Sequence, residues 1–441
     1  MKRDLENHLA ELINKANEES LIIIIEGARQ VGKTYAVNNF LKDRSKVISF
    51  NLEKDLVLKM QIDGTATFDD FNNLLCTKCG LRDEADQILF IDEAQESEKL
   101  GSYVRFMKEE WKHIKVILTG SSMSKLFKKD ERVPVGRVKY LVLRPFSFRE
   151  FLRIAEREAK LNMMEEIIAN HATYDPNSVT VQILHKDLLD LFDSYLLIGG
   201  MPAAVKAYYQ DGAEGAMEIF AELVASQRED FYRREKVKTY LFIDALKGVA
   251  NHVGTPAKYA HIAQNNYDAK LITQMLKDWH IIIEIEQTSS SGTINFAPKR
   301  YLYDTGILRF IRDTSIANIS VLHTMDEKLR IPLGGILENQ VVNSLLGSKG
   351  GYIPLSGWKR SSKTDIEVDF IIKNIHNCIP CEVKATLKPS ERHFKNMIYY
   401  HQHNKTVNGE MMLVSLGPYM LFPELTKECG IKAMNRPAYL V

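Results

Sequence analysis

The residues from Gly27 to Thr34 read Gly-Ala-Arg-Gln-Val-Gly-Lys-Thr, which is the spacing of a phosphate-binding loop, G-x-x-x-x-G-K-[ST]. Glycines at these positions let main-chain N–H groups turn towards phosphate oxygens, and the N-terminus of a following helix adds positive potential. The residues expected to bind a nucleotide are Gly27, Ala28, Arg29, Gln30, Val31, Gly32, Lys33 and Thr34. Among them, Lys33 would contact the β- and γ-phosphates, and the Thr34 hydroxyl would ligate Mg²⁺.

Two neighbouring acids, Asp92 and Glu93, follow the apolar run 87–91. Asp92 would hold Mg²⁺ through water, and Glu93 would polarise the water that attacks the γ-phosphate. The competing interpretation is a pair of surface acids after a strand. The sequence has no guanine-specificity motif of the N-K-x-D type, so it favours ATP, with Mg²⁺ as the metal and Lys33 and Glu93 as catalytic residues.

Another set of charged residues lies near the C-terminus. Residues 364–372 alternate polar and apolar before becoming apolar, which predicts a strand that carries Asp369. After a turn around 374–377, residues 379–384 read as the return strand.

The return strand carries Glu382 and Lys384, and side chains two residues apart on a strand share a face. The turn could bring Asp369 beside Glu382, and Glu338 is expected on a helix that begins near Gly335. The competing interpretation is a solvated sheet edge whose acids pair with lysine.

Short apolar runs and helical patterns alternate in the first third of the chain. A first amphipathic helix is expected from Leu5 to Ala16, and further helices over 35–42 and 100–112. The predicted buried strands are 21–25, 46–50, 87–91, 115–119 and 139–143. Strands that alternate with helices predict a three-layer α/β domain with a parallel sheet, from about residue 15 to 145.

The remaining chain divides by pattern into three further segments. The expected boundaries are 1–145 for the phosphate-binding domain, 146–235 for a helical segment, 236–330 for a winged helix-turn-helix and 331–441 for a mixed α and β domain.

The winged helix-turn-helix is predicted from the order helix, turn, helix, hairpin. A short first helix is expected over 257–263 and a second helix over 268–279. Strands are expected over 280–287 and 293–296. In DNA-binding versions the second helix enters the major groove. Its candidate DNA contacts are Lys270, Thr273, Gln274 and Lys277. The alternative is a domain that only packs on the nucleotide domain.

Composition narrows the class of protein. The 441 residues include 58 Lys plus Arg and 57 Asp plus Glu, for a formal charge of +1. This balance excludes an acidic tail and a globally basic nucleic-acid coat protein, but not local DNA binding. Lys359, Arg360 and Lys363 beside Trp358 would form a phosphate-contacting loop or a solvated turn.

Targeting signals and cysteines add an expected location. No apolar run is long enough to span a bilayer, and the N-terminus lacks a signal-peptide pattern. Five cysteines suit a reducing cytoplasm, so a cytoplasmic protein is expected. The pairs Cys76-x-x-Cys79 and Cys378-x-x-Cys381 have the spacing of zinc ligands, although ordinary packing is favoured.

Five motifs together carry a family resemblance. They are the phosphate-binding loop with its Arg-Gln insert, Ile91–Ala94, Leu143–Phe151, Tyr195–Pro202 and Tyr301–Gly306. They resemble a widespread family of bacterial and archaeal AAA+-like ATPases with a C-terminal domain of long-unknown function. The resemblance implies a P-loop ATPase core, a helical and winged-helix middle, and a C-terminal α/β domain like the restriction endonucleases.

The same resemblance implies further nucleotide-site residues. Ser121 or Ser122 would sense the γ-phosphate, or would simply cap a helix. Arg137 would act as an arginine finger, with Arg132 as a competitor, and a finger that acts in trans would require a homo-oligomer.

The C-terminal acids resemble the active site of the restriction-endonuclease and Holliday-junction-resolvase superfamily. Glu338, Asp369, Glu382 and Lys384 would fill its four catalytic places, although Val368 stands where proline is common. The resemblance implies that Asp369 and Glu382 gather Mg²⁺ on a scissile phosphate of DNA, while Lys384 orients or deprotonates the attacking water.

Two functions therefore stay open. One is an ATPase whose nucleotide state controls a Mg²⁺-dependent, nuclease-like domain that acts on DNA. The other is a regulatory ATPase switch that binds a protein partner, with the C-terminal domain an inactive docking or DNA-binding module.

Overall fold

The computed structural model of the protein describes residues 2–17, 19–121, 126–127, 138–170, 174–235, 238–263, 265–289, 296–312, 327–347, 354–361, 366–373, 377–404 and 409–441. The chain divides into two compact units. The first is mainly Met1–Arg144 with Asp278–Ile281, and the second is Pro145–Lys277, Ile282–Ser348 and Ile353–Val441. The four segments expected from the sequence stay a prediction.

The described part of the first unit contains one sheet of five parallel strands, in the order β2–β3–β4–β1–β5. The strands are β1 (Leu21–Glu26), β2 (Val47–Asn51), β3 (Ile88–Asp92), β4 (Lys115–Thr119) and β5 (Val138–Val142). Each lies within one residue of the predicted run. The prediction is accurate because strands covered on both faces are apolar along their whole length.

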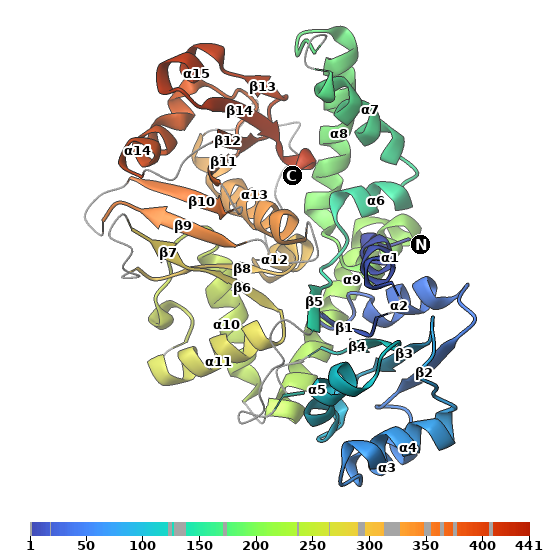
Figure 1. Ribbon diagram of the computed structural model, residues 1–441. Helices are drawn as coiled ribbons and strands as arrows, with labels where there is room; N and C mark the ends of the chain where they lie inside the picture. The colour runs from blue at the N-terminus through green and yellow to red at the C-terminus, as the bar shows by residue number, and fades with distance from the viewer. Residues whose placement is uncertain are drawn as a thin grey trace. The chain divides into compact units, whose positions relative to one another are not determined.

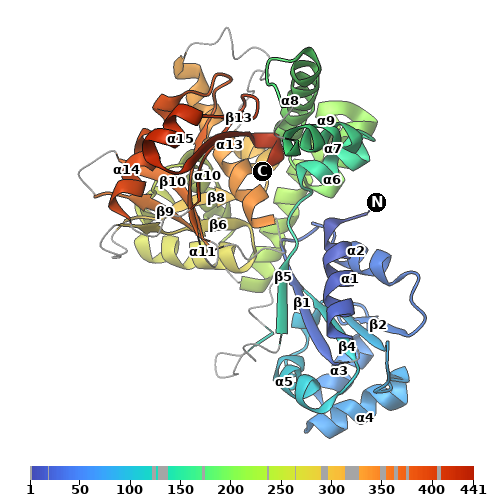
Figure 2. The same ribbon diagram turned by 45° about the horizontal axis from the view of Figure 1, so that its top comes forward.

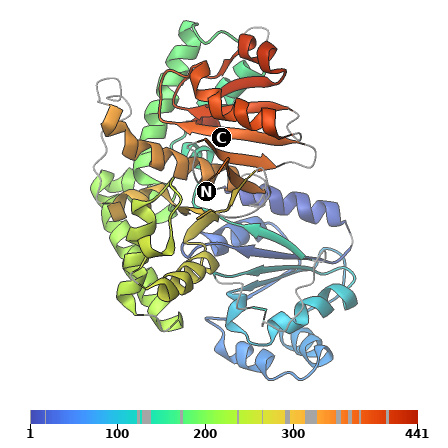
Figure 3. The ribbon, with the colours of Figure 1, turned by 90° about the vertical axis from the view of Figure 1, so that its left-hand side faces the viewer.

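Helices cover both faces of this sheet (Figures 1 and 3). The helices are α1 (Asp4–Ala16), α2 (Lys33–Leu41), α3 (Leu56–Asp63), α4 (Phe68–Cys79) and α5 (Leu100–Glu110), with the 3₁₀ turn η1 (Ala94–Glu96). In Figure 3, α1 lies on one side of the sheet, and the helices of residues 56–110 lie on the other. The three helices predicted here are confirmed as α1, α2 and α5. Ser122, Arg132 and Arg137 lie outside the described residues.

The second unit begins with a run of helices, as the sequence predicts. They are α6 (Phe148–Ile154), α7 (Glu158–Ala169), α8 (Val179–Ile198), α9 (Pro202–Glu235) and α10 (Thr239–Asn251). In the described chain no single helix is long and apolar enough to cross a membrane. Taken together, α8 and α9 are long and apolar enough, but the two helices are bent by 113° where they meet.

Three of the sequence motifs meet in the second unit at the end of α8. Gly199 has a φ of +69°, and a β-carbon there would lie 2.3 Å from a carboxylate oxygen of Asp304. A β-carbon at Gly200 would lie 2.2 Å from the Phe146 carbonyl, and one at Gly306 would lie 2.2 Å from that of Ile198. Asp304 accepts a hydrogen bond from Gly200 N at 2.7 Å. These glycines therefore permit a close crossing of three chain segments.

A small antiparallel sheet pairs β6 (Ile282–Ile285) with β8 (Lys299–Leu302). The helices α11 (Asn266–Asp278) and α12 (Thr305–Arg312) lie before and after it in the chain. The short helix predicted over 257–263 is only the 3₁₀ turn η3 (Tyr259–His261). Most of the strand predicted over 293–296 lies outside the described chain, and among the described residues the partner of β6 is β8.

The second helix of the predicted winged helix-turn-helix is confirmed as α11, but not all its candidate DNA contacts are available. The Thr273 side chain is buried and donates to the Ala269 carbonyl at 2.6 Å. Lys277 pairs with Glu284 at 2.9 Å. Thr273 was wrong as a DNA contact, since its helical position faces the core.

A mixed sheet follows, with seven strands in the described chain in the order β13–β14–β12–β11–β10–β9–β7. Its strands are β7 (Gln287–Thr288), β9 (Leu355–Lys359), β10 (Glu367–Lys373), β11 (Cys378–Lys384), β12 (Glu410–Ser415), β13 (Met420–Leu421) and β14 (Lys432–Pro437). The helix α13 (Glu327–Gly347) lies on one face, and α14 (Lys395–His403) and α15 (Pro423–Cys429) lie on the other (Figures 1 and 2). The sheet and helices hold the C-terminal charged residues.

The helix that carries Glu338 begins earlier than predicted. It starts at Glu327 and not near Gly335. Gly334 and Gly335 lie inside α13, and a β-carbon on Gly335 would meet the Val253 carbonyl at 3.2 Å. Gly335 therefore allows the main chain at Val253 to approach α13 closely, and it does not mark the start of the helix.

Candidate functional site

The loop between β1 and α2 has the backbone that a phosphate site requires. Gly27 and Gly32 have φ angles of 149° and 92°, and Gln30 has 64°. A β-carbon on Gly27 would lie 2.2 Å from the Leu143 carbonyl oxygen, so only glycine fits there. The loop therefore curves as the G-x-x-x-x-G-K-[ST] spacing predicts.

Lys33 lies within this curve. Its ammonium donates to the carbonyls of Gly27 at 2.8 Å and Ala28 at 2.9 Å. Burial lowers the pKa of Lys33 to about 8, while the nearby Glu93 and Asp92 carboxylates act in the opposite direction. Because carbonyl groups carry only partial charge, a phosphate would be a stronger partner for this ammonium.

Asp92 is held at the carboxyl end of β3 by neutral donors. Its Oδ2 accepts from Thr34 Oγ1 at 2.9 Å and Asn51 Nδ2 at 2.8 Å, and its Oδ1 accepts from Thr119 Oγ1 at 2.5 Å. Asn51, Asp92 and Thr119 end three adjacent parallel strands, so the sheet topology places them together. Asn51 and Thr119 were not predicted as site residues. The one indication in the sequence is that each is a polar residue at the end of an apolar strand.

Ser121, one of the two predicted candidates for a γ-phosphate sensor, lies buried two residues beyond Thr119. Its role as a sensor stays a prediction.

Glu93 follows Asp92 and has a left-handed φ of 53°. Its Oε2 accepts a hydrogen bond from Gln95 Nε2 at 2.6 Å. Burial raises the pKa of Glu93, and the Gln95 hydrogen bond and Lys33 oppose that rise. A carboxylate at this position can accept a proton from water, as the predicted role requires.

The residues present fit Mg²⁺ and a nucleoside triphosphate. The Thr34 hydroxyl and the Asp92 carboxylate are oxygen donors in contact with each other, as a Mg²⁺ site of this kind requires. The Lys33 ammonium would face the phosphates. When bound, the metal would neutralise charge that develops on the phosphate oxygens.

Two further contacts support the loop, and the sequence did not reveal them. The buried Arg3 donates to the Val31 carbonyl at 2.7 Å. The Arg29 guanidinium lies 5.8 Å from the centre of the Trp279 ring, which belongs to the first unit.

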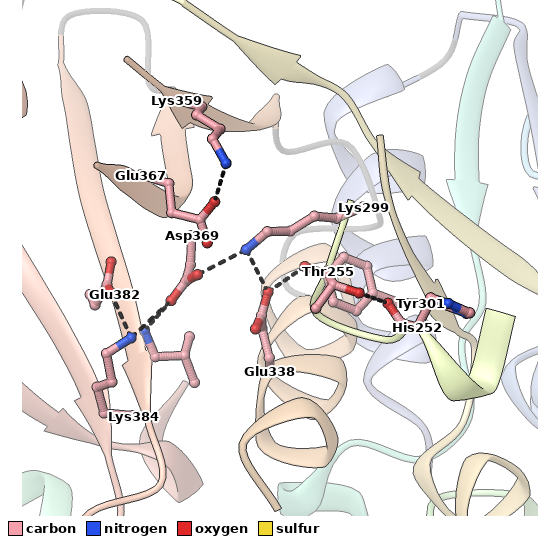
Figure 4. Close-up of polar contacts among 11 residues, drawn as sticks. His252, Thr255, Lys299, Tyr301, Glu338, Lys359, Glu367, Asp369, Glu382 and Lys384 are labelled. Carbon is pink, nitrogen blue, oxygen red and sulfur yellow. Dashed lines mark hydrogen bonds and ion pairs between the residues drawn. The ribbon is translucent and has the colours of Figure 1, made fainter. Parts of the chain in front are cut away.

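The four C-terminal residues of the predicted catalytic set lie together (Figure 4). Phe370 on β10 pairs with Cys381 on β11, which places Asp369 beside Glu382. Lys384 Nζ lies 2.6 Å from Glu382 Oε1 and 3.9 Å from Asp369 Oδ2. Glu338 comes from α13 on the same face of the sheet.

A fifth residue, Lys299 on β8, completes this group. Its ammonium lies 2.9 Å from Asp369 Oδ1 and 3.1 Å from Glu338 Oε1 (Figure 4). Tyr301, on the same strand, donates to Glu338 Oε1 at 2.6 Å. We call Lys299, Glu338, Asp369, Glu382 and Lys384 the C-terminal ion cluster. Lys299 was missed because it lies 70 residues from Asp369 in the sequence.

Burial and charge shift the pKa values of the cluster in different directions. Burial raises the pKa of Glu338 to about 7, with Lys299 acting against the rise. Burial and the Asp369 charge raise the pKa of Glu382 to about 8. Burial alone would also raise the pKa of Asp369, but the ammonium groups of Lys299 and Lys384 hold it below its usual range. Asp369 is therefore the most strongly charged carboxylate of the cluster.

The cluster forms part of the wall of a cavity of about 770 Å³. The charged or titratable cavity residues are Arg312, Glu338, Glu367, Asp369, Lys384, Arg392 and His393. Arg312 Nη1 is buried and has no hydrogen-bond partner among the described residues. The cavity therefore contains one buried guanidinium nitrogen, Arg312 Nη1, that has no hydrogen-bond partner among the described residues.

The cluster does not fit a resident divalent ion. Lys299 engages Glu338 Oε1 and Asp369 Oδ1, and Lys384 engages Glu382 Oε1, so an ammonium group pairs with one oxygen of each carboxylate. Glu382 Oε2 is buried without a hydrogen-bond partner among the described residues. In the described part of the chain, no group of three or more His, Cys, Asp or Glu is arranged to hold a metal. The expected Mg²⁺ ligation by Asp369 and Glu382 stays a prediction, and in this structure the Lys299 and Lys384 ammonium groups pair with these two acids.

The remaining sequence candidates have structural partners. Lys359 lies 3.6 Å from Glu367, Arg360 stacks 4.9 Å over Tyr399, and Trp358 is buried. Trp358 and Lys359 belong to the end of β9 and Arg360 follows it, whereas Lys363 lies outside the described residues, so the loop or turn stays a prediction. Cys381 is buried, as expected for packing, and all five cysteines are free.

Comparisons with known proteins identify the type of domain that contains the loop from Gly27 to Thr34. Residues 19–152 match a family model described as an AAA domain. Residues 189–317 and 333–418 match two models described as domains of unknown function, DUF8612 and DUF4143. The first unit therefore contains a P-loop domain of the ATPase type. No curated protein matches the chain.

Several solved structures are similar at low sequence identity. A Walker-type ATPase of Pyrococcus abyssi is 15% identical, with 70% of this chain and 95% of that chain covered, at a TM-score of 0.42. The Orc1 protein of Aeropyrum pernix, solved in complex with DNA, is 14% identical, with 70% and 91% covered, at 0.29. A STAND protein of Pyrococcus horikoshii is 14% identical, with 79% and 45% covered, at 0.27. These scores carry no functional argument.

Proposed function

We propose that Lys33, Thr34, Asp92 and Glu93 bind and hydrolyse ATP with Mg²⁺. The contact between Thr34 and Asp92, directly beside the Lys33 ammonium in its glycine loop, carries this proposal. Lys33 holds the phosphates, Thr34 and Asp92 hold the metal, and Glu93 accepts the proton of the attacking water.

The test is ATP binding and phosphate release by the full chain. Lys33→Ala is expected to lose both, whereas Glu93→Gln is expected to keep binding and lose at least about 100-fold in turnover. Glu98→Gln, the same chemical change on an exposed side chain, serves as the control. Normal hydrolysis by the Lys33 and Glu93 variants would show that the site is assigned wrongly.

For the C-terminal domain, we propose a DNA-binding module that the nucleotide state of the first unit regulates. The cavity beside the ion cluster supports this proposal, because Arg312 and Arg392 line it while its carboxylates are engaged by lysines. Guanidinium groups that have no acidic partner among the described residues suit phosphate oxygens.

The test is the binding of duplex, branched and single-stranded DNA over a range of salt, with and without ATP. Arg312→Gln with Arg392→Gln is expected to weaken binding and reduce its salt dependence, and the exposed Arg228→Gln is the control. A protein partner whose capture depends on Lys33, without salt-sensitive DNA binding, would replace this proposal with a protein switch.

The second candidate function is a Mg²⁺-dependent nuclease that ATP controls. The placement of Asp369, Glu382 and Lys384 on adjacent strands supports it, but it requires Lys299 to release Asp369 so that a metal ion can bind. Cleavage of DNA by the wild-type chain with Mg²⁺ or Mn²⁺, lost in Asp369→Ala while ATP turnover continues, would establish it. Absence of cleavage on all three DNA forms would exclude it.

The oligomeric state belongs to the same proposal. An arginine finger at Arg137 that acts in trans requires an assembly, which sedimentation with and without ATP would detect.

A further inference from the structure

We infer that Lys299 is the built-in cation of the C-terminal ion cluster and that it closes this site to divalent metal ions. Its ammonium lies between Asp369 Oδ1 and Glu338 Oε1, at 2.9 and 3.1 Å. A cation shared by two carboxylates from different elements is the arrangement that a metal ion would otherwise supply. The inference does not depend on ATP hydrolysis by the first unit.

The neighbours of Lys299 fix it in this position. On the same strand, Leu302 N donates to Asn339 Oδ1 at 2.8 Å, and the Leu302 carbonyl accepts from Asn343 at 2.9 Å. Both asparagines belong to α13, the helix that carries Glu338. Strand β8 is therefore hydrogen-bonded to the helix that supplies one carboxylate, which aligns Lys299 with Glu338.

The opposite side of β8 is also held. Arg300 donates to Glu284 at 2.8 Å and to the Ala257 carbonyl at 2.6 Å. The pairing of β6 with β8 continues through Ile285 and Lys299. Because β8 is held in this way, the ion pairs of Lys299 are not open to competition from solvent ions, unlike those of a surface lysine.

Burial separates the two lysines of the cluster by role. The side chain of Lys299 is 1% exposed, whereas that of Lys384 is 42% exposed and lines the cavity. Lys384 can meet a ligand, and Lys299 cannot without moving. We therefore assign Lys299 to holding the carboxylates and not to contact with a substrate.

The charges of the cluster oppose a second cation. Its three carboxylates face two ammonium groups, which leaves at most one negative charge. A divalent ion among the same oxygens would lie beside the Lys299 ammonium, and their repulsion would be strong in a buried site. Metal entry therefore requires the Lys299 ammonium to leave Asp369 and Glu338.

The experiment measures Mn²⁺ binding to the nucleotide-free full chain by the electron paramagnetic resonance of free Mn²⁺. Asp369→Asn identifies any binding at the cluster and separates it from binding at the nucleotide site. The wild type is expected to bind no Mn²⁺ that depends on Asp369. Wild-type binding that Asp369→Asn abolishes would overturn the inference.

Two substitutions at Lys299 complete the test. Lys299→Met removes the cation and is expected to gain one Mn²⁺ site, at least tenfold tighter than any in the wild type and dependent on Asp369. Lys299→Arg keeps the charge and is expected to behave as the wild type. A folded Lys299→Met variant without this gain would contradict the inference.

A second variant guards against failure to fold. Lys299→Met with Glu338→Gln keeps the net charge of the wild-type cluster and is expected to unfold at a higher temperature than Lys299→Met alone. No recovery would contradict the role of Lys299 as the partner of Glu338. ATP turnover, measured in parallel, reports on the proposed function of the first unit separately.

Discussion

At the nucleotide site Lys33 donates to main-chain carbonyls, and Asp92 accepts from the hydroxyl and amide groups of Thr34, Asn51 and Thr119. In the C-terminal ion cluster Lys299 donates directly to carboxylates. Both regions contain a buried lysine close to buried acids. The first holds its charges with neutral groups and so leaves them for a charged ligand, whereas the second pairs its acids directly with lysines.

The same substitution should cost much more stability in the C-terminal ion cluster than at the nucleotide site. Asp369→Asn leaves the buried Lys299 with one carboxylate fewer and is expected to reduce the free energy of unfolding by about 3–5 kcal/mol. Asp92→Asn is expected to change it by less than about 1 kcal/mol, because its hydroxyl and amide partners can also pair with an amide. Urea unfolding followed by circular dichroism measures both. Equal losses would remove the distinction between the two regions.

The same pair should reverse its order in ATP turnover. Asp92→Asn weakens the metal site and is expected to reduce turnover about 100-fold or more. Asp369→Asn is expected to leave turnover within about twofold of the wild type, provided that the variant is folded at the assay temperature. Steady-state phosphate release measures both, and a large loss in Asp369→Asn would connect the cluster to hydrolysis.

ATP binding should depend on pH through Lys33. Burial lowers its pKa to about 8, and a bound phosphate favours the protonated form. Above this pH, binding must take up a proton, so the dissociation constant is expected to rise by up to about tenfold per pH unit. Titrations between about pH 7.5 and 9.5 measure this change.

Lys33→Met is the control, with weak binding that does not vary over this range. In the C-terminal ion cluster, burial lowers the pKa of Lys384 but Asp369 and Glu382 raise it further, so Lys384 stays protonated over the same pH range. A wild-type affinity independent of pH would contradict the role of Lys33.

The smallest effect is expected at the edge of the cluster. Lys359 lies 3.6 Å from Glu367, with side chains 21% and 31% exposed. Because solvent screens such a pair, Lys359→Ala should reduce the free energy of unfolding by about 0.5 kcal/mol. If urea unfolding showed a loss of free energy as large as that of Asp369→Asn, the burial of an ion pair would not determine how much stability its removal costs.

The first unit could be predicted closely because its signals are local. The strands of the parallel sheet are continuous apolar runs, and the loop from Gly27 to Thr34 contains its own glycines, lysine and hydroxyl. The neutral partners of Asp92 were harder to predict, since Asn51 and Thr119 come from strands distant in sequence. Their position at strand ends became informative only once the order of strands was known.

The second unit was harder to predict where an element depends on its neighbours. Gly335 suggested a helix start, but it lies inside α13, where its missing side chain admits the Val253 carbonyl. Among the described residues the partner of β6 is β8, which was not predicted because Lys299–Leu302 has no apolar run before Tyr301. Tertiary contacts there override the local pattern.

The sequence by itself determined the phosphate loop, the strand that ends in Asp92 and Glu93, and the alternation that brings Asp369 to Glu382. Each depends on spacing within a short stretch of chain, which backbone geometry converts directly into position. Only the tertiary structure decided whether these charges are available. Lys299 meets Asp369 from 70 residues away, and only the folding of β8 against α13 makes that ammonium the partner of the acids.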